Sequence, residues 1–287
     1  MIFIIESGST KSDWVLVDNK SKQTFYKTIG FNPYFHSSDV VAAEIRKNKS
    51  IMAHVGEVSK IFFYGAGCSS ERLNKEIESG LKAVFTEAEV VVDHDLLACA
   101  YATYDGEPGI SCIIGTGSNS CFFDGAELSE EVPALGYVLG DEGSGSYFGK
   151  FLLANFLYHR LPKDILVDFQ ETYKLSHSEI VSNVYKSDSA NVFIASFMPF
   201  IVKHKEHEFF KQIIVNGLKT FMEVHVCCYE GYLNTPVHFV GSLSALLENH
   251  LRQAADDLGI EIKSIIAKPV DNLVSYHLKY ILKNQLA

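Results

Sequence analysis

The sequence predicts an α/β protein made of two domains. Short apolar runs such as 61–64 (Ile-Phe-Phe-Tyr) have the length of strands and suit strands that are covered on both faces. Helical segments lie between these runs, which is the pattern of layered α/β domains. A turn-rich stretch at 105–109 interrupts the pattern, and a second strand-rich segment follows it. We therefore expect an N-terminal domain over residues 1–107 and a C-terminal domain over residues 108–271.

Each domain is expected to open with strands and to continue with helices. The expected strands of the first domain are Ile2–Glu6, Trp14–Asp18, Thr24–Ile29, Ile61–Tyr64 and Val90–Val92, and its expected helices are Asp39–Lys47, Glu71–Phe85 and Leu96–Tyr104. The expected elements of the second domain are strands at Ser111–Ile114 and Cys121–Asp124, a long helical region over 143–230, a strand at Val237–Val240, a helix at Ala245–Leu258 and a strand at Ile262–Ile265.

The composition excludes several classes of protein. The 287 residues are 47% hydrophobic, which is enough for one large or two medium cores. The net charge of −10, with no basic patch, argues against a nucleic-acid partner. Six scattered cysteines contain no CxxC pair, so we expect neither a zinc site nor a disulfide framework, and a reducing cytoplasm fits best. The apolar run Met1–Ile5 is too short to span a membrane, so no membrane partner is expected.

Three loops of small residues carry the strongest functional signal. The first, Glu6–Lys11 (Glu-Ser-Gly-Ser-Thr-Lys), joins two predicted strands, and the second, Gly115–Asn119 (Gly-Thr-Gly-Ser-Asn), follows a strand. Such turns leave backbone N–H groups that can hold a phosphate. The third, Leu139–Ser144 (Leu-Gly-Asp-Glu-Gly-Ser), opens a predicted helix over 144–159, and a helix start is an anion site. Each loop alone is most often an ordinary turn, but their order and spacing together are specific.

With these loops the chain resembles the N-acetylglucosamine kinase branch of the actin/hexokinase-type ATPase superfold, which is related to the activator ATPases of 2-hydroxyacyl-CoA dehydratases. The resemblance covers nearly the whole chain. Its best-matched segments are Glu6–Trp14, Gly30–Pro33, Asp95–Ala98, Gly115–Asn119, Gly136–Ser144 and Val240–Leu247.

The resemblance implies two actin-like ATPase (ribonuclease H-like) domains with a cleft between them. It also implies that the last helix, Asn272–Lys283 in the segment 272–287, returns to pack on the first domain. The implied activity is ATP-dependent transfer of phosphate to the 6-hydroxyl of N-acetylglucosamine or a related amino sugar, with Mg²⁺. The implied partners are therefore the sugar and ATP, and family members are often homodimers.

Asp95 is the expected catalytic base. A carboxylate between a strand and a helix can accept the proton of an attacking sugar hydroxyl. From the pattern alone Asp95 is more often a helix N-cap, and the resemblance is what favours catalysis. Asp93 is the rival carboxylate, and His94 between them is expected to be packed or exposed rather than a relay.

The resemblance also assigns binding residues. The expected sugar-binding residues are Asn32, Ser118, Asn119, Gly136 and Asp141. The expected nucleotide-binding residues are Ser7, Gly8, Ser9, Thr10 and Lys11 in the first loop, Gly115, Thr116 and Gly117 in the second, and Gly241 and Ser242 near the adenosine. The plain alternatives are a turn asparagine before proline for Asn32 and a helix cap for Ser242 or Ser244.

One departure from the family keeps other functions open. Glu6 stands where relatives have the Asp that organises Mg²⁺, and Ser7 and Ser9 replace common glycines. Because Mg²⁺ demands near-ideal octahedral geometry, the longer Glu6 can change metal use or activity. A non-catalytic sugar or nucleotide sensor therefore remains an alternative. An activator-type ATPase is a weaker one, because the cysteines lack the glycine-rich context of a bridging iron–sulfur cluster.

Overall fold

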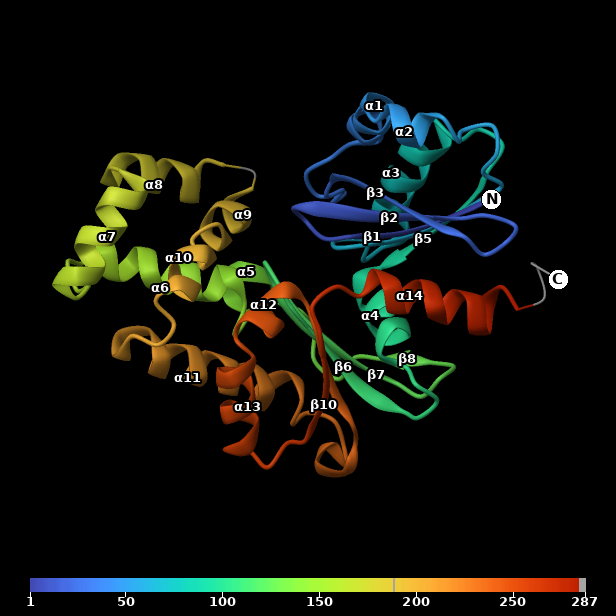
Figure 1. The fold of residues 1–287 in the computed structure, drawn as a ribbon. Coiled ribbons are helices and arrows are strands. Elements are labelled where there is room, and N and C mark those ends of the chain that lie inside the picture. The colour runs from blue at the N-terminus through green and yellow to red at the C-terminus, as the bar shows by residue number, and fades with distance from the viewer. Residues whose placement is uncertain (188, 284–287) are drawn as a thin grey trace. The chain divides into compact units, whose positions relative to one another are not determined.

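The computed structural model describes residues 1–187 and 189–283 and divides the chain into two compact units (Figure 1). Unit 1 is Met1–Asp105 together with the chain from Lys268 onward, and unit 2 is Gly106–Ala267. Residues 284–287 of the predicted C-terminal segment lie outside the described residues.

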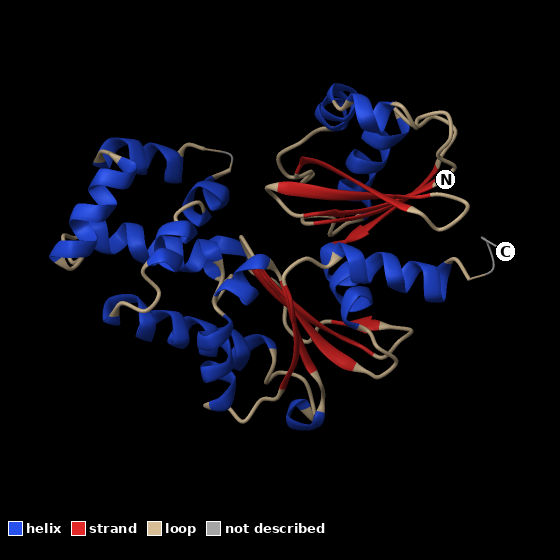
Figure 2. Cartoon of the chain, viewed as in Figure 1, coloured by secondary structure: helices blue, strands red, loops and turns tan. Residues whose placement is uncertain are grey.

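Unit 1 is a five-stranded sheet with helices on both faces (Figures 1 and 2). Its strands are β1 (Ile2–Ser7), β2 (Lys11–Val17), β3 (Gln23–Ile29), β4 (Lys60–Gly65) and β5 (Glu89–His94), in the order β3-β2-β1-β4-β5. Its helices are α1 (Ser38–Lys47), α2 (Lys49–Met52), α3 (Glu71–Lys82), α4 (Asp95–Thr103) and α14 (Val270–Tyr276), which continues as a π-helical turn at His277–Ile281.

Successive side chains of each strand point to opposite faces of the sheet, so the core of unit 1 has two layers. Phe3, Ile5 and Trp14 lie on the face covered by α1 and α3. Ile2 and Ile4 lie on the opposite face, against α4 and α14. Both faces of the sheet are thus buried, as the apolar strand runs predict.

Unit 2 contains the second five-stranded sheet and a helical region. Its strands are β6 (Gly109–Ile114), β7 (Ser118–Phe123), β8 (Leu128–Ser129), β9 (Val237–Val240) and β10 (Ile262–Ile266), in the order β10-β9-β6-β7-β8. Its helices are α5 (Gly136–Leu139), α6 (Gly145–Leu157), α7 (Lys163–Tyr173), α8 (His177–Tyr185), α9 (Ala190–Ala195), α10 (Met198–Lys203), α11 (Glu208–His225), the 3₁₀ turn Tyr232–Asn234, α12 (Ser242–Leu246) and α13 (Glu248–Asp256).

The two sheets share one topology. In each unit an antiparallel meander of three strands (β1-β2-β3 or β6-β7-β8) is extended by two parallel strands beside the first. The carboxyl ends of β1, β4 and β5 therefore lie at one edge of the first sheet, and those of β6, β9 and β10 lie at one edge of the second. In open α/β sheets, ligands bind at this edge.

The predicted α/β class is confirmed, but several predicted helices were wrong in extent. The long helical region over 143–230 is broken into α6 to α11 in the described residues, because local signals stop and restart it. Lys174 ends α7 in the left-handed conformation, and Ser176 starts α8 with a capping box. The predicted helix Ala245–Leu258 is likewise divided at Leu247, and the short elements α2, α5 and β8 were not predicted.

Among the described helices, none combines the length and the apolarity needed to cross a membrane.

The packing of α6 against α9 leads to a stability prediction. A Cβ on Gly149 would lie 2.0 Å from the carbonyl oxygen of Ile194, which is backbone and cannot turn aside. Gly149→Ala should therefore lower the free energy of unfolding by about 2 kcal/mol, even after alanine's better helix propensity. Denaturant unfolding would measure this. Gly56→Ala is the control, because its Cβ would meet no atom within 4 Å. Equal stability of both variants would contradict the packing argument.

Candidate active site

The first predicted phosphate loop joins β1 to β2 in unit 1. β1 ends at Ser7 and β2 begins at Lys11, so the loop proper is residues 8–10. The hydroxyl of Ser7 is fully buried, where it accepts from the Ser12 hydroxyl (2.6 Å) and from the Phe31 N–H (2.8 Å). Ser7 and Ser9 both have negative φ, so the serines replace the family's glycines without backbone strain. The side chain of Ser7 therefore supports the loop from inside the unit.

Gly30 and Asn32 contact this loop and restrict its position. A Cβ on Gly30 would lie 2.1 Å from the carbonyl oxygen of Gly8, so only glycine allows this approach. The Asn32 amide donates to the Ser9 hydroxyl (3.2 Å), and its Oδ1 accepts from the Tyr34 N–H (3.0 Å). Asn32 is thus a turn asparagine, and it also contacts the loop predicted to bind phosphate.

Strand register places three acidic side chains and a tyrosine in one row. Glu6 pairs with Asp13 of β2 on one side and with Tyr64 of β4 on the other, and Tyr64 pairs with Asp93 of β5. Directly paired residues point to the same face of a sheet. This is the face against α4 and α14, and the Tyr64 hydroxyl lies 2.9 Å from Nε2 of His277.

Asp95 lies at the same edge, as the first residue of α4. The alternative in which Asp95 caps this helix was wrong. His94 is the N-cap, because its Nδ1 accepts from the Leu97 N–H at 3.2 Å. Asp93 instead accepts from the His94 N–H (2.8 Å). The Asp95 carboxylate therefore does not serve as the N-cap, which fits the role predicted for it.

The charges at this edge interact strongly. Burial, followed by the negative charges of Asp13 and Asp95, raises the pKa of Glu6 to about 7, and Lys11 opposes this. Lys11 lies 3.2 Å from one oxygen of Asp13, and Lys27 lies 4.0 Å from the other. The site thus has an excess of acidic groups around Glu6.

An excess of buried and half-buried carboxylates suits a cation. The described residues contain no ready-made cluster of three or more His, Cys, Asp or Glu ligands. Mg²⁺ does not need one, because it is usually held by one or two carboxylates, water and substrate phosphates. Glu6, beside Asp13 and Asp95, fits that arrangement.

In unit 2 the second and third loops are joined by backbone hydrogen bonds. The N–H groups of Gly145 and Ser146 donate to the carbonyls of Gly115 (2.8 Å) and Thr116 (3.0 Å), and the Tyr147 N–H donates to the Ser144 hydroxyl (3.2 Å). The prediction that the start of this helix, now α6, offers free N–H groups to an anion was therefore wrong. The helix start instead holds the loop Gly115–Gly117.

Asp141 lies where the two loops meet. It has a left-handed backbone (φ 57°), which is uncommon for a residue with a side chain. The Ser118 N–H and the Ser146 hydroxyl donate to its two carboxylate oxygens (3.4 and 3.3 Å). A Cβ on Gly117 would lie 3.0 Å from both oxygens, so this glycine gives the carboxylate room. Burial raises the pKa of Asp141, and the two hydrogen bonds oppose the shift.

Gly241 and Ser242 follow β9 at the same sheet edge. Gly241 has φ 125°, and a Cβ there would lie 2.3 Å from the carbonyl oxygen of Ile114. Gly241 itself is the N-cap of α12 and no side chain caps the helix, while the Ser244 hydroxyl donates to the Val240 carbonyl (3.3 Å). The alternative in which Ser242 or Ser244 caps this helix was therefore wrong.

Two predicted sugar ligands are less closely connected. The Asn119 amide donates to Glu130 (3.1 Å), and its Oδ1 accepts from the Ser120 N–H. Gly136 is exposed at the start of α5 and accepts from the Gly140 N–H (2.8 Å). In the part of the chain that the structure describes, the hydrogen bonds that join Ser118 to Asp141 do not extend to these two residues.

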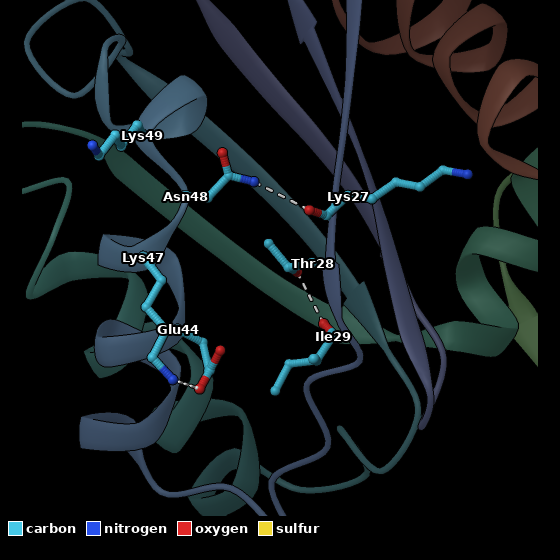
Figure 3. Close-up of a pocket in the computed structure, with 7 residues that line it drawn as sticks. All are labelled: Lys27, Thr28, Ile29, Glu44, Lys47, Asn48 and Lys49. Atoms are coloured by element: carbon cyan, nitrogen blue, oxygen red, sulfur yellow. Dashed lines mark hydrogen bonds and ion pairs between the residues drawn. The ribbon is translucent and has the colours of Figure 1, made fainter.

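A surface groove of unit 1 contains none of the predicted site residues (Figure 3). It is lined by Lys27, Thr28, Ile29, Glu44, Lys47, Asn48 and Lys49. Figure 3 shows the Lys27 side chain pointing away from the groove, while its carbonyl accepts from the Asn48 amide (3.1 Å). Glu44 is paired with Lys47. The groove is therefore a gap between α1 and β3 whose polar groups are largely paired with one another.

Sequence reasoning missed Asp13 and Ser146 as parts of the site. Asp13 stands two residues after Lys11 on a strand, and this spacing puts both side chains on one face. The sequence therefore contained a signal for Asp13. The contact of Ser146 with Asp141 depends on the turn at the start of α6, which no periodicity indicates.

The raised pKa of Glu6 predicts a pH dependence of stability. Its folded pKa of about 7 lies above the ordinary value of 4.5, so its contribution is fully present below pH 4.5 and is lost as the pH rises through 7. Relative to wild type, Glu6→Gln should gain about 3 kcal/mol of unfolding free energy between pH 4.5 and pH 8. Unfolding of both proteins without metal or nucleotide, at several pH values, would measure this. A pH-independent difference would contradict the shift.

Comparisons with solved structures give matches over nearly the whole chain. Neither family models nor curated proteins give a match to the chain. Among solved structures, a candidate N-acetylglucosamine kinase from Porphyromonas gingivalis matches with a TM-score of 0.90 and 31% identity, covering 98% of this chain and 99% of its own. One from Chromobacterium violaceum has a TM-score of 0.70 and 13% identity, covering 96% and 98%.

A more distant likeness concerns the fold alone. A ROK-family glucokinase from Streptomyces griseus, solved with glucose and AMPPNP, has a TM-score of 0.53 and 13% identity, covering 96% of this chain and 97% of its own. The two mixed sheets therefore match the actin-like fold of sugar kinases. Since the 31% identity extends over nearly the whole of both chains, the chain belongs to the N-acetylglucosamine kinase family.

Proposed function

We propose that this protein is an ATP-dependent kinase that phosphorylates the 6-hydroxyl of N-acetylglucosamine or a related amino sugar. The observation that carries the proposal is the 31% identity to the P. gingivalis protein over 98% of the chain. The position of Asp95 beside Glu6 at the carboxyl edge of the first sheet supports it, because phosphoryl transfer needs an acceptor base near the phosphate-binding groups.

Asp95 is the proposed base. Its carboxylate accepts the proton of the sugar hydroxyl while the hydroxyl oxygen bonds to the γ-phosphorus of ATP. The bond from that phosphorus to the β,γ-bridging oxygen breaks, and ADP leaves with the electron pair. Because Asp95 is the first residue of α4, its carboxylate lies at the positive end of the helix dipole.

The loops hold the nucleotide in this proposal. Thr10 and Lys11 contact the β- and γ-phosphates, and Asp13 holds the Lys11 ammonium in place through its ion pair. The loop Gly115–Gly117 forms a second phosphate contact, and its backbone is fixed by the start of α6. Gly241 and Ser242 border the adenosine.

Glu6, with Asp13 and Asp95 near it, would hold Mg²⁺, directly or through water. When bound, the ion neutralises phosphate charge. Before it binds, the near-neutral pKa of Glu6 allows that carboxyl to keep a proton, which lowers the repulsion among the acidic side chains.

Asp141, Asn119, Ser118, Gly136 and Asn32 are the proposed sugar contacts. Carboxylate and amide groups suit hydroxyls because they accept, and in the amide case donate, hydrogen bonds. Two donors already fix the Asp141 carboxylate, so its remaining lone pairs have a defined direction. Such prior positioning favours selective binding of one sugar.

Glu6 supports a second candidate, a sugar or nucleotide sensor without turnover. Its longer side chain and raised pKa differ from the aspartate of the family. The location of Asp95 argues for the kinase, because a pure binder has no use for an acceptor base.

The reaction can be tested directly by ADP release. With Mg²⁺-ATP and a panel of glucose, glucosamine, N-acetylglucosamine, N-acetylmannosamine and N-acetylmuramic acid, we expect turnover with an N-acetylated sugar. Boiled enzyme and ATP alone are the controls. No turnover with any sugar, under Mg²⁺ or Mn²⁺, would exclude the kinase and favour the sensor.

The base can be tested by a matched pair of substitutions. Asp95→Asn should lower kcat by about 10²- to 10⁴-fold, because general-base catalysis contributes that much, while sugar binding persists. Asp93→Asn is the control, since its carboxylate accepts from the His94 N–H and is not the proposed base. Steady-state kinetics would give kcat, and calorimetry the sugar affinity. A larger loss in Asp93→Asn would reassign the base.

A further inference from the structure

The loop that carries Asp141 lies against one stripe of α11. A Cβ on Gly143 would lie 3.1 Å from the carbonyl oxygen of Gly217 and 3.2 Å from the Cβ of Phe221. Nε2 of His225 lies 3.6 Å from a carboxylate oxygen of Glu142. Residues four apart share a face of a helix, so α11 presents this stripe as one surface.

His225 is itself held firmly in place. It is 3% exposed, and its ring stacks on Phe221 with 5.1 Å between the ring centroids. The Ser120 hydroxyl of β7 donates to its carbonyl (2.5 Å). The end of α11 is therefore anchored to the sheet, and the imidazole extends from that anchor toward Glu142.

The imidazole has one polar partner at the loop. Burial lowers the pKa of His225 and the carboxylate of Glu142 opposes this, so we assign the neutral ring with its proton on Nε2, directed at Glu142. Nδ1 is buried and has no hydrogen-bond partner among the described residues. The ring's single N–H thus faces the Glu142 carboxylate, 3.6 Å from Nε2.

Glu142 directly follows Asp141, the non-glycine residue of this loop that has a left-handed backbone. Asp141 is left-handed, and such a conformation persists only where its surroundings over-determine it. The Ser118 hydroxyl donates to the Glu142 carbonyl (2.7 Å), so both the main chain and the side chain of Glu142 are held. We propose that Glu142 and His225 are positioning residues that fix the backbone of Asp141 and thereby set the affinity for the sugar.

This inference rests on the proposed function, because it assigns the effect of the pair to sugar binding through Asp141. The test therefore uses two measurements, of which only one needs activity. The first is hydrogen exchange, followed by mass spectrometry, of peptides covering residues 136–146 in the protein without ligands. The second is the KM for the sugar and for ATP.

His225→Leu should speed exchange in the 136–146 peptides and raise the sugar KM by about tenfold, since small displacements of a binding group are costly. The KM for ATP should change less, within about twofold, because the start of α6 holds the loop Gly115–Gly117 through main-chain bonds that involve neither Glu142 nor His225. His225→Gln keeps an N–H at the reach of Nε2 and should restore most of the wild-type sugar KM.

His250→Leu is the matched control. His250 is also 3% exposed, also has a buried Nδ1 without a partner in the described residues, and also lies near a glutamate, Glu206 at 4.0 Å. Its Nε2 contacts the Lys205 carbonyl, away from the loop. This variant should leave the exchange of the 136–146 peptides and the sugar KM unchanged.

Wild-type exchange and wild-type sugar KM in His225→Leu would overturn the inference. If His225→Leu does not fold, Glu142→Gln gives the same test from the more exposed partner, whose side chain is 19% exposed. If the wild-type protein phosphorylates no sugar, the proposed function fails while exchange still decides the positioning role. Faster exchange with an unchanged sugar KM would contradict the link to the sugar.

Discussion

The backbone hydrogen bonds that pair β1 with β2 and β4 determine which side chains of unit 1 share a face. They bring Glu6 beside Asp13 and Tyr64, on the face where Ile2 and Ile4 pack against α4 and α14. A shift by one residue would send Glu6 to the opposite face and Ser7 into its place. The buried hydroxyl of Ser7, hydrogen-bonded to Ser12 and Phe31, opposes such a shift. The charge cluster is thus a consequence of register.

Unit 2 also places an acidic side chain at the carboxyl edge of its sheet, but it positions that side chain differently. Its first strand, β6, has the same neighbours in the same directions as β1, but the acidic residue of the site comes from a loop and not from a strand. The carbonyls of Gly115 and Thr116 take up the first N–H groups of α6. This arrangement makes the loop rigid through main-chain bonds. Side-chain chemistry is then left to Asp141.

Much of this could be predicted from the sequence because its signals are local. Strands such as β1 and β6 contain short apolar runs, and the loops Glu6–Lys11 and Gly115–Asn119 stand at their carboxyl ends. The α6 to α11 region was predicted less well, because each helix end, such as the left-handed Lys174 and the cap Ser176, is decided by a few residues within a long helix-like pattern.

In the candidate site, too, the features with local sequence signals could be predicted and the others could not. Asp95 could be proposed because the family motif surrounds it, but the sequence does not indicate that the side chain of His94, and not that of Asp95, caps α4. The contact of Glu142 with His225 joins segments far apart in the chain. No periodicity or spacing encodes such a pair, so only the fold reveals it.

The left-handed backbone at Asp141 limits which residues evolution or an experimenter can place there. Asparagine visits this conformation readily and has a similar shape, whereas alanine adds a backbone cost to the loss of two hydrogen bonds. A loss of affinity in an alanine scan would thus combine a conformational penalty with a missing contact. Asparagine separates the two, and natural variation at this position should be confined to aspartate, asparagine and glycine.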